Sequence, residues 1–325
     1  MPDIQLRWGL LSTAHINRSL IPPLKESKRN QLIAVASRDQ QKAEAYASEW
    51  KIPKAFGTYE ELLSDPEVDV IYNPLPNSLH AAWTVKALEA GKHVLCEKPL
   101  ATTLDDVDAI IAAANKTGKV VAEAFMYRHA PQTLKVKELV NGGAIGKVVM
   151  MRGVFSFSLT NPQDIRLDPG LGGGSIWDIG CYPISYARFI CAQEPIQVFG
   201  LQVDSPTGVD QNFSGEMRFP GDVVAQFQSS FGSPYFTFFE IFGDKGRIAI
   251  PVPFKPGASE KFYMFQNGNE KEIEVKSGHL YNGEIEDMAD AILDHKPARI
   301  SLDDSRNNVR AILNLLESAK TGAPV

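Results

Sequence analysis

The chain of 325 residues contains only three cysteines, Cys96, Cys181 and Cys191, and no two of them form a C-x-x-C pair. An odd number of cysteines without such a pair gives neither a disulfide framework nor a zinc ribbon. This usage is typical of a reducing compartment, so we expect a cytoplasmic protein. No cluster of histidines, cysteines and carboxylates has the spacing of metal ligands, so we expect no catalytic metal.

The sequence also lacks a long apolar run and an excess of positive charge. No apolar run approaches the roughly 20 residues that span a bilayer, and the segment 1–11 enters a strand-like pattern at once, which predicts no signal peptide. The net charge of −6 argues against a nucleic-acid partner. With 44% hydrophobic and 22% charged residues, the composition predicts a soluble globular protein with a full core and no membrane or nucleic-acid partner.

The first 124 residues alternate between short apolar runs and helical patterns. This alternation predicts a doubly wound parallel sheet, an α/β Rossmann domain over residues 1–124. The strand-like runs are "LRWGLL", "QLIAVAS", "VDVIYN", "KHVLCE" and "KVVAEAF", and the helical patterns cover 13–27, 39–50, 58–64, 78–91 and 103–118.

From residue 125 onward the pattern changes to one of many strands. We expect a second, α+β domain over residues 125–325, with a large, mostly antiparallel open sheet. Its expected elements are a helix over 131–141, a strand over 147–159, a glycine-rich turn and helix in "GLGGGSIWDIGCYPISYARFICA", several strands over 196–275, and helices over 280–294 and 303–320.

Glycine is missing where a dinucleotide-binding protein has its phosphate-binding turn. Aligning G-x-G-x-x-G with "STAHIN" puts Ser12, Ala14 and Asn17 at the glycine positions. The anion is bound by backbone N–H groups at a helix N-terminus, so small residues can replace glycine there. Taken alone, the stretch fits a cofactor loop and a plain strand–helix junction equally well. Its candidate cofactor contacts are Ser12, Thr13, Ala14, His15 and Ile16.

The end of the second strand carries Ser37 and Arg38 instead of the acidic residue that binds the ribose in NAD-specific sites. A hydroxyl beside a guanidinium suits a 2′-phosphate. The pair therefore favours NADP. A solvated surface arginine is the alternative, and Asp39 keeps NAD possible.

The stretch "CEKPLA" (96–101) resembles the glucose-fructose oxidoreductase, inositol dehydrogenase and MocA family, of which the E-K-P triplet is the hallmark. "NPLPNSLHA" (73–81), "EAFMYRHAPQ" (123–132) and "GGGSIWDIGCYPI" (172–184) resemble other motifs of that family in the right order, so the resemblance covers essentially the whole chain. It implies that the loop after Leu11 is a phosphate cradle. Further cofactor contacts are expected from Leu75, Asn77, His80, Glu97, Lys98 and Arg128. For His80, a structural role at the start of the next helix is an equal alternative.

Most members of the family carry an aspartate and a histidine four residues apart, and here the pair is Asp178 and Tyr182. With a tyrosine at that position, the sequence resembles one branch of the family, which includes dimeric dihydrodiol dehydrogenases and NADP-dependent xylose dehydrogenases. Residues at i and i+4 share one helix face. Because a free tyrosine has a pKa of about 10, a nearby ammonium group is needed to favour the phenolate. Our hypothesis is Tyr182 as general acid/base, Lys98 as its electrostatic partner and Asp178 as the residue that orients a substrate hydroxyl.

The predicted function is an NADP-preferring oxidoreductase that transfers a hydride between nicotinamide and a sugar-like polyol or aldose. Alternatives are a trans-dihydrodiol dehydrogenase or cyclic ketose reductase and, from another class, a dinucleotide-binding regulatory protein without turnover. Substrate contacts are expected from Lys98, Phe125, Tyr127, Arg128, Trp177, Asp178 and Tyr182.

The stretch "YFTFFEIFG" (235–243) directs apolar residues to both faces of its strand. Such a strand is covered by helices or by a second copy of the chain. Members of the family commonly pair through this sheet, which implies a homodimer or a dimer of dimers.

Overall fold

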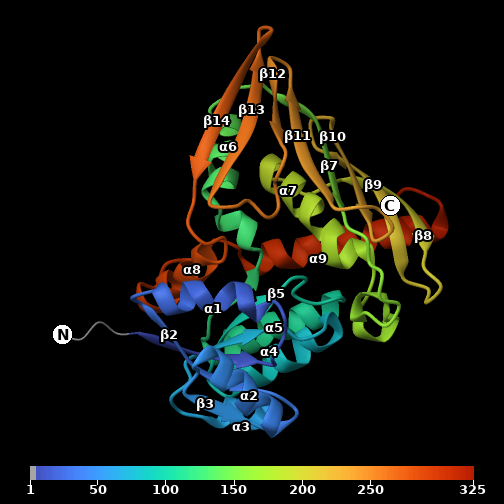
Figure 1. The fold of residues 1–325 in the computed structure, drawn as a ribbon. Helices are drawn as coiled ribbons and strands as arrows, with labels where there is room; N and C mark the ends of the chain where they lie inside the picture. Colours follow the sequence, from blue (N-terminus) through green and yellow to red (C-terminus); the bar gives the residue numbers. More distant parts are fainter. Residues whose placement is uncertain (1–4) are drawn as a thin grey trace. The chain divides into compact units, whose positions relative to one another are not determined.

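The computed structural model describes residues 5–325. The chain forms two compact units (Figure 1). The first contains the chain up to Met126 together with Tyr281–Arg306, and the second contains Tyr127–Leu280 and Asn307–Val325. None of the helices in the described part of the chain is long and apolar enough to cross a membrane.

The first unit contains a six-stranded parallel sheet in the order β3-β2-β1-β4-β5-β6, the strand order of a Rossmann fold. The predicted fold class is confirmed. The alternation pattern missed β3, because three half-buried residues at a sheet edge form no apolar run. The strands are β1 (Leu6–Leu11), β2 (Asn30–Ala36), β3 (Lys54–Phe56), β4 (Val70–Asn73), β5 (His93–Glu97) and β6 (Val121–Ala124).

The helices of this unit begin and end at residues whose side chains and backbone suit those positions. Thr58 forms a capping box with Glu61, and the Thr103 hydroxyl accepts from the Asp106 N–H at 3.1 Å. Gly118 ends its helix with φ 66°, in the left-handed region that favours glycine. The helices are α1 (Asn17–Glu26), α2 (Gln40–Trp50), α3 (Tyr59–Ser64), η1 (Asn77–Leu79), α4 (His80–Glu89), α5 (Leu104–Thr117) and α8 (Asn282–Leu293).

The segment Tyr281–Arg306 belongs to the first unit, although the sequence boundary assigned it to the second domain. Ile285 and Met288 of α8 are fully buried. The Arg29 guanidinium, just before β2, donates to the carboxylates of Asp290 (2.6 Å) and Asp294 (2.8 Å). This return of the chain depends on contacts across about 260 residues, and no local pattern reveals such a pairing.

The second unit contains an eight-stranded sheet in the order β14-β13-β12-β11-β7-β10-β9-β8. All its pairings are antiparallel except that of β7 with β10, as the sequence predicted in outline. The strands are β7 (Val148–Ser156), β8 (Gln197–Asp204), β9 (Asp210–Phe219), β10 (Val223–Ser230), β11 (Phe236–Gly243), β12 (Gly246–Ile250), β13 (Ser259–Gln266) and β14 (Asn269–Lys276).

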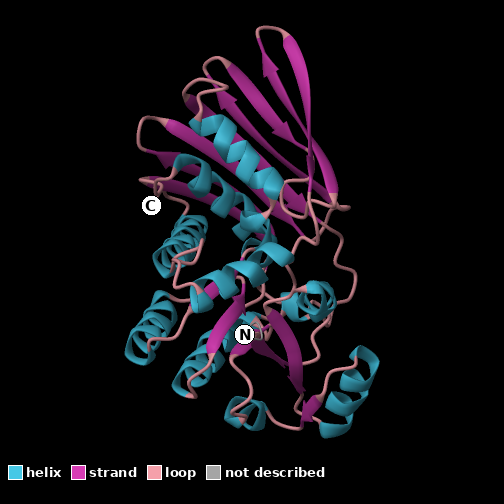
Figure 2. Ribbon diagram, turned by 90° about the vertical axis from the view of Figure 1, so that its left-hand side faces the viewer, coloured by secondary structure: helices cyan, strands magenta, loops and turns pink. Residues whose placement is uncertain are grey.

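Figure 2 shows that the helices of the second unit lie on one face of this sheet, and among residues 5–325 no helix of that unit covers the other face. Buried and exposed residues accordingly alternate along β9 and β10. The helices are α6 (Pro131–Asn141), the π-helical turn η5 (Ile176–Gly180), which continues into α7 (Cys181–Cys191), and α9 (Leu302–Thr321), within which the boundary between the units falls. Short 3₁₀ turns occupy η2 (Met126–His129), η3 (Ile165–Leu167) and η4 (Pro169–Leu171).

Candidate active site

The loop after β1 has the geometry of a phosphate-binding turn although it contains no glycine. Ser12 has φ 95°, a conformation that L-residues rarely adopt and that glycine normally supplies. The fully buried Asn17 donates from its side-chain amide to the Ser12 carbonyl at 2.8 Å. A side-chain hydrogen bond thus holds the turn that glycines hold elsewhere.

The same turn presents backbone donors at the N-terminus of α1. The helix begins at Asn17 and not at residue 13 as predicted. The preceding N–H groups, those of Thr13, Ala14, His15 and Ile16, donate to no other group in the described part of the chain. Such donors, with the positive end of the helix dipole, fit an anion such as a pyrophosphate.

The end of β2 suits a 2′-phosphate. Arg38 is exposed and Ser37 is buried beside it. The Asp39 carboxylate, the alternative ribose ligand, accepts from the Lys42 N–H at 3.1 Å and so serves as the N-cap of α2. Arg38 is therefore the exposed side chain at this strand end whose charge suits a phosphate.

Asn73, at the end of β4, shapes the loop that contains Leu75, Asn77 and His80. Its buried amide donates to the His80 carbonyl and to the Thr84 hydroxyl, both at 3.1 Å, and its oxygen accepts from the Leu75 N–H at 3.4 Å. One buried side chain thus fixes both ends of the loop.

The ring of His80 joins this loop to the E-K-P turn. Its Nδ1 lies 2.7 Å from the Pro99 carbonyl and its Nε2 lies 2.6 Å from the Leu75 carbonyl. Burial lowers the pKa of His80 to about 4, so at neutral pH the ring carries one N–H and donates to one carbonyl at a time. This placement supports the structural alternative for His80.

Two buried carboxylates hold the E-K-P turn after β5. Tyr72 donates from its hydroxyl to Glu97 Oε1 at 2.5 Å, and Glu123 Oε1 accepts from the Leu100 N–H at 2.9 Å. The Lys98–Pro99 peptide is cis, and Lys98 is partly buried. The predicted cofactor residues Ser12 to Ile16, Ser37, Arg38, Leu75, Asn77, His80, Glu97 and Lys98 thus follow the carboxyl ends of β1, β2, β4 and β5, the edge at which Rossmann folds bind dinucleotides.

Glu284 of α8 adds a third buried carboxyl group that the sequence analysis missed. Its side chain is 1% exposed, and neither oxygen has a hydrogen-bond partner in the described part of the chain. Burial, and next the neighbouring Glu97 and Asp287, raise the pKa of Glu284 well above its ordinary value. The raised pKa favours the protonated form of this carboxyl group beside Glu97.

In the second unit, Asp178 and Tyr182 lie on one continuous helical segment. Asp178 belongs to the π-helical turn η5 and not to a regular α-helix as predicted, while Tyr182 lies in the first turn of α7. A π turn inside a helix is frequent at functional sites. Tyr182 is 3% exposed, and its ring packs against those of Tyr127, Phe155 and Phe254 with centroids 5.5–5.7 Å apart.

Arg166, which the sequence analysis did not single out, contacts the candidate aspartate. Its Nε donates to Asp178 Oδ2 at 2.7 Å, and its Nη1 donates to Asp164 Oδ1 at 3.3 Å. The Asp178 charge is the largest cause that raises the pKa of Arg166. The eleven residues between Arg166 and Asp178 include four glycines and no repeat period, so spacing could not reveal the pair.

The start of the helical segment is fixed by Asp210, the first residue of β9. Its Oδ2 accepts from the Ser175 hydroxyl (2.7 Å) and from the Ile176 N–H (2.8 Å), and the Ser229 hydroxyl lies 2.9 Å from that of Ser175. Burial raises the pKa of Asp210 to about 6. At Gly174, φ is 123° and a Cβ would lie 2.2 Å from Asp210 Oδ1, so this contact requires glycine.

The other predicted substrate residues are buried. Tyr127 donates to the Ser185 hydroxyl at 2.8 Å, and Arg128 donates to the same hydroxyl at 3.3 Å while its guanidinium stacks on Phe189. Phe125 is 1% and Trp177 is 7% exposed. The contacts of Tyr127 and Arg128 are those of packing residues, and a role toward substrate or cofactor stays a prediction for all four.

Residues 5–325 contain no group of three or more histidine, cysteine or acidic side chains that could hold a metal ion. The fold and the loops described above define the class of the protein, a dinucleotide-binding oxidoreductase fold with a second, open-sheet unit.

Comparison with known families agrees with this class. Residues 6–125 match the family model described as "Oxidoreductase family, NAD-binding Rossmann fold", and residues 133–249 match the model described as "GFO/IDH/MocA C-terminal domain".

Relatives with similar sequences act on sugars and diols, according to their names. D-xylose 1-dehydrogenase (NADP(+)) 2 of Haloferax volcanii is 36% identical over 324 residues, 98% of this chain and 99% of the relative. Trans-1,2-dihydrobenzene-1,2-diol dehydrogenase of Xenopus laevis is 35% identical over 249 residues, 75% of each chain. The crystal structure of aldose-aldose oxidoreductase from Caulobacter crescentus, complexed with glycerol, matches with a TM-score of 0.93 and 27% identity over 99% of both chains.

The chain therefore belongs to the GFO/IDH/MocA family of oxidoreductases. The resemblance predicted from the E-K-P triplet and the three other motifs is confirmed, as is an oxidoreductase with a nicotinamide-dinucleotide-binding Rossmann domain.

The buried Glu284 carboxyl generates a prediction about stability. The unfolded chain releases this proton above about pH 4.3. Because the pKa of Glu284 is raised in the folded protein, the folded protein releases the proton only at higher pH, and folding becomes less favourable as the pH rises between the two pKa values. In Glu284→Gln, the loss of unfolding free energy between pH 5 and pH 8 should be smaller, by up to about 1.4 kcal/mol per pH unit.

Urea denaturation at pH 5, 6, 7 and 8 measures this effect. Glu286→Gln, a partly exposed carboxyl two residues away on the same helix, is the matched control. Equal pH dependence in wild type and Glu284→Gln would contradict a protonated Glu284.

Proposed function

We propose that the protein is an NADP-preferring dehydrogenase of sugars or related polyols, with Tyr182 as its general acid/base. The observation that carries the proposal is the placement of Asp178 and Tyr182 on one helical segment whose start is fixed by Asp210. The family membership and the named activities of the relatives support the substrate class.

The proposed chemistry is the interconversion of a secondary or anomeric hydroxyl and a carbonyl. In oxidation, the substrate carbon loses a hydride and the hydroxyl proton passes to the Tyr182 oxygen. In reduction, Tyr182 returns that proton to the carbonyl oxygen. NADP, when bound, supplies the hydride acceptor or donor.

Each of the other two residues has one role in this proposal. The Lys98 ammonium favours the phenolate of Tyr182 over the neutral phenol. Asp178, paired with Arg166, accepts a hydrogen bond from a substrate hydroxyl and so orients it.

Two other substrate classes remain as alternatives. A trans-dihydrodiol or a cyclic ketose would present the same hydroxyl or carbonyl to the same residues. The presence of Lys98, Asp178 and Tyr182 favours an enzyme over a dinucleotide-binding regulatory protein without turnover, since such a protein needs the cofactor loop but no acid/base residues.

Replacing Tyr182 tests the proposed acid/base directly. Tyr182→Phe keeps the ring among Tyr127, Phe155 and Phe254 but removes the hydroxyl. We expect kcat to fall by a factor of about 10² or more, with NADPH affinity by fluorescence titration within a factor of two or three. Tyr186→Phe, one turn along the same helix, is the control, and near wild-type turnover in Tyr182→Phe would show that another group carries the proton.

The preference for NADP is proposed to depend on Arg38. Asp39 caps α2, while the exposed Arg38 guanidinium can make two charge-assisted hydrogen bonds to a 2′-phosphate. In Arg38→Ala, the KM for NADP should rise about 10- to 100-fold while the KM for NAD changes little.

Steady-state kinetics with both cofactors at saturating substrate measure this preference. Lys42→Ala removes another exposed cation of the same region and serves as the control. An unchanged ratio of the two KM values in Arg38→Ala would assign the preference to other residues.

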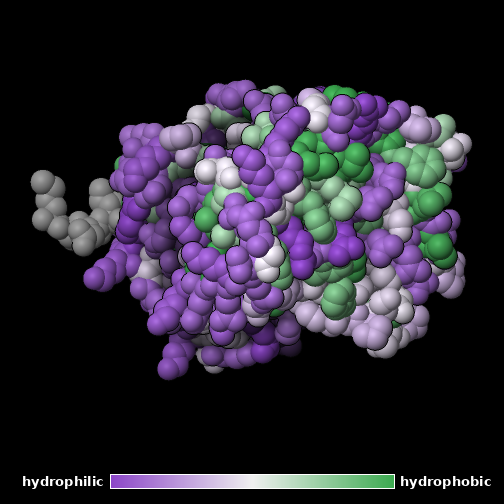
Figure 3. Space-filling model, turned by 90° about the horizontal axis from the view of Figure 1, so that it is seen from above, coloured by the Kyte–Doolittle hydropathy of each residue, from purple (hydrophilic) through white to green (hydrophobic). Residues whose placement is uncertain are grey.

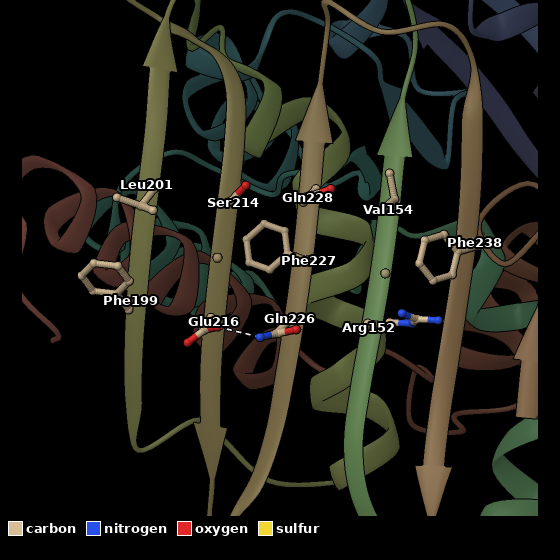
Figure 4. A pocket seen from close by; sticks show the side chains of 12 residues that line it. Arg152, Val154, Phe199, Leu201, Ser214, Glu216, Gln226, Phe227, Gln228 and Phe238 are labelled. Atoms are coloured by element: carbon tan, nitrogen blue, oxygen red, sulfur yellow. Dashed lines mark hydrogen bonds between the residues drawn. The ribbon is translucent and has the colours of Figure 1, made fainter. Parts of the chain in front are cut away.

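The uncovered face of the eight-stranded sheet is proposed to pair two copies of the chain as a homodimer, or as part of a dimer of dimers. Figure 4 shows side chains that line a pocket on this face, among them Phe199, Leu201 and Phe238. Figure 3 shows apolar side chains gathered among hydrophilic ones on the side of the molecule seen from above. Glu240 pairs with both Arg152 and Arg247 there, so its carboxylate is neutralised and the three side chains together keep one positive charge. Apolar residues on this face include Leu201 (59% exposed) and Val203 (60% exposed).

Light scattering at about 10 μM should therefore give at least twice the 35.7 kDa of one chain. Leu201→Asp should shift the protein toward the monomer, because a carboxylate would be buried between the copies. Val149→Asp, on the opposite face of the sheet, should not. A strictly monomeric wild type would contradict the proposed interface.

We also propose a cytoplasmic location, which agrees with three free cysteines.

A further inference from the structure

A short 3₁₀ turn, η3, holds the Arg166 side chain against Asp178. Arg166 lies in η3, whose first residue follows the N-cap Asp164, and the Asp164 carboxylate accepts from both the N–H and the guanidinium of Arg166. The guanidinium carbon also lies 5.9 Å from the centroid of the Phe157 ring. The side chain therefore has fixed contacts on several sides although it is 42% exposed.

Two glycines fix the backbone of Arg166. Its carbonyl accepts from the Gly174 N–H at 2.9 Å. A Cβ on Gly173 would lie 2.5 Å from the same carbonyl oxygen, closer than any real contact. Arg166 thus contacts Gly173 and Gly174, and Asp210 contacts Gly174. Because these glycines directly precede the helical segment that contains Asp178, the contacts fix the position of Arg166 relative to Asp178.

A carboxylate accepts hydrogen bonds and a guanidinium donates them. Side by side, the two groups can bind two substrate oxygens on adjacent carbons. One oxygen, as a hydroxyl, donates to the carboxylate, and the other accepts from the guanidinium. Within the guanidinium, the hydrogen bonds to the described residues come from Nε and Nη1, and the side chain is partly exposed, which leaves room for a further acceptor.

We propose that Arg166 is a specificity-determining residue that holds Asp178 in place and donates to the substrate oxygen adjacent to the hydroxyl that Asp178 accepts from. The site then selects substrates with oxygens on two neighbouring carbons over simple alcohols. This inference rests on the proposed function, because it assumes that Asp178 contacts the substrate.

The test removes the guanidinium and the adjacent oxygen separately and together. Wild type and Arg166→Met are compared on two matched pairs of substrates with NADP: D-glucose against 2-deoxy-D-glucose, and trans-cyclohexane-1,2-diol against cyclohexanol. In wild type, loss of the adjacent hydroxyl should lower kcat/KM about 10- to 100-fold, since a donor of the site is left unpaired. In Arg166→Met, the same loss should cost less than about threefold.

Further variants and a measurement of cofactor binding separate recognition from folding. Arg166→Gln replaces Arg166→Met should the latter unfold. Arg166→Lys should restore part of the discrimination because it keeps a donor and a charge. NADPH affinity should stay unchanged in all variants. Arg218→Met, which removes an exposed arginine paired with Asp222, is the control and should discriminate as wild type does.

The outcomes distinguish the two proposals. An active wild type whose discrimination is unchanged in Arg166→Met would overturn the role of Arg166 and leave the proposed function intact. A wild type that turns over none of the four compounds would overturn the proposed substrate class and this inference with it.

Discussion

The placement of Asp178 and Tyr182 depends on the hydrogen bonds that Asp210 accepts from Ser175 and Ile176. They fix the point at which the helical segment begins, and Asp178 and Tyr182 follow from it at set positions. The contact exists only because Gly174 lacks a side chain and adopts φ 123°. A buried carboxylate at a helix start is stabilised by the N–H groups and by the helix dipole, which explains why the segment can begin in the interior.

In the first unit, buried side chains likewise fix the backbone of the segments that carry candidate residues. Asn73, Glu123 and Asn17 each use a buried side chain to hold a loop backbone at the end of a strand. Buried polar groups of this kind are costly unless they are paired, so the loops have few alternative conformations. In each unit, the backbone that carries the candidate residues is thus held rigid by hydrogen bonds to buried side chains.

The sequence was sufficient for the features that depend on local pattern. Alternating apolar runs revealed the Rossmann sheet, and the motifs around Lys98 and Tyr182 revealed the family. It was insufficient where partners are far apart in the chain or where one residue changes the geometry. The return of α8 to the first unit depends on Arg29 and Asp290, and the pairing of Arg166 with Asp178 depends on how glycines fold the intervening loop. The π turn at Asp178 and the buried Glu284 leave no periodic trace either.

The central claim is that the Tyr182 hydroxyl exchanges the proton of the reacting group. A crystal structure of the protein with NADP and a sugar substrate tests it most directly. The account predicts the Tyr182 oxygen about 2.6–3.2 Å from the substrate oxygen on the carbon that faces the nicotinamide. A substrate whose reacting oxygen is bound by other groups, with the Tyr182 hydroxyl out of hydrogen-bond reach, would contradict it.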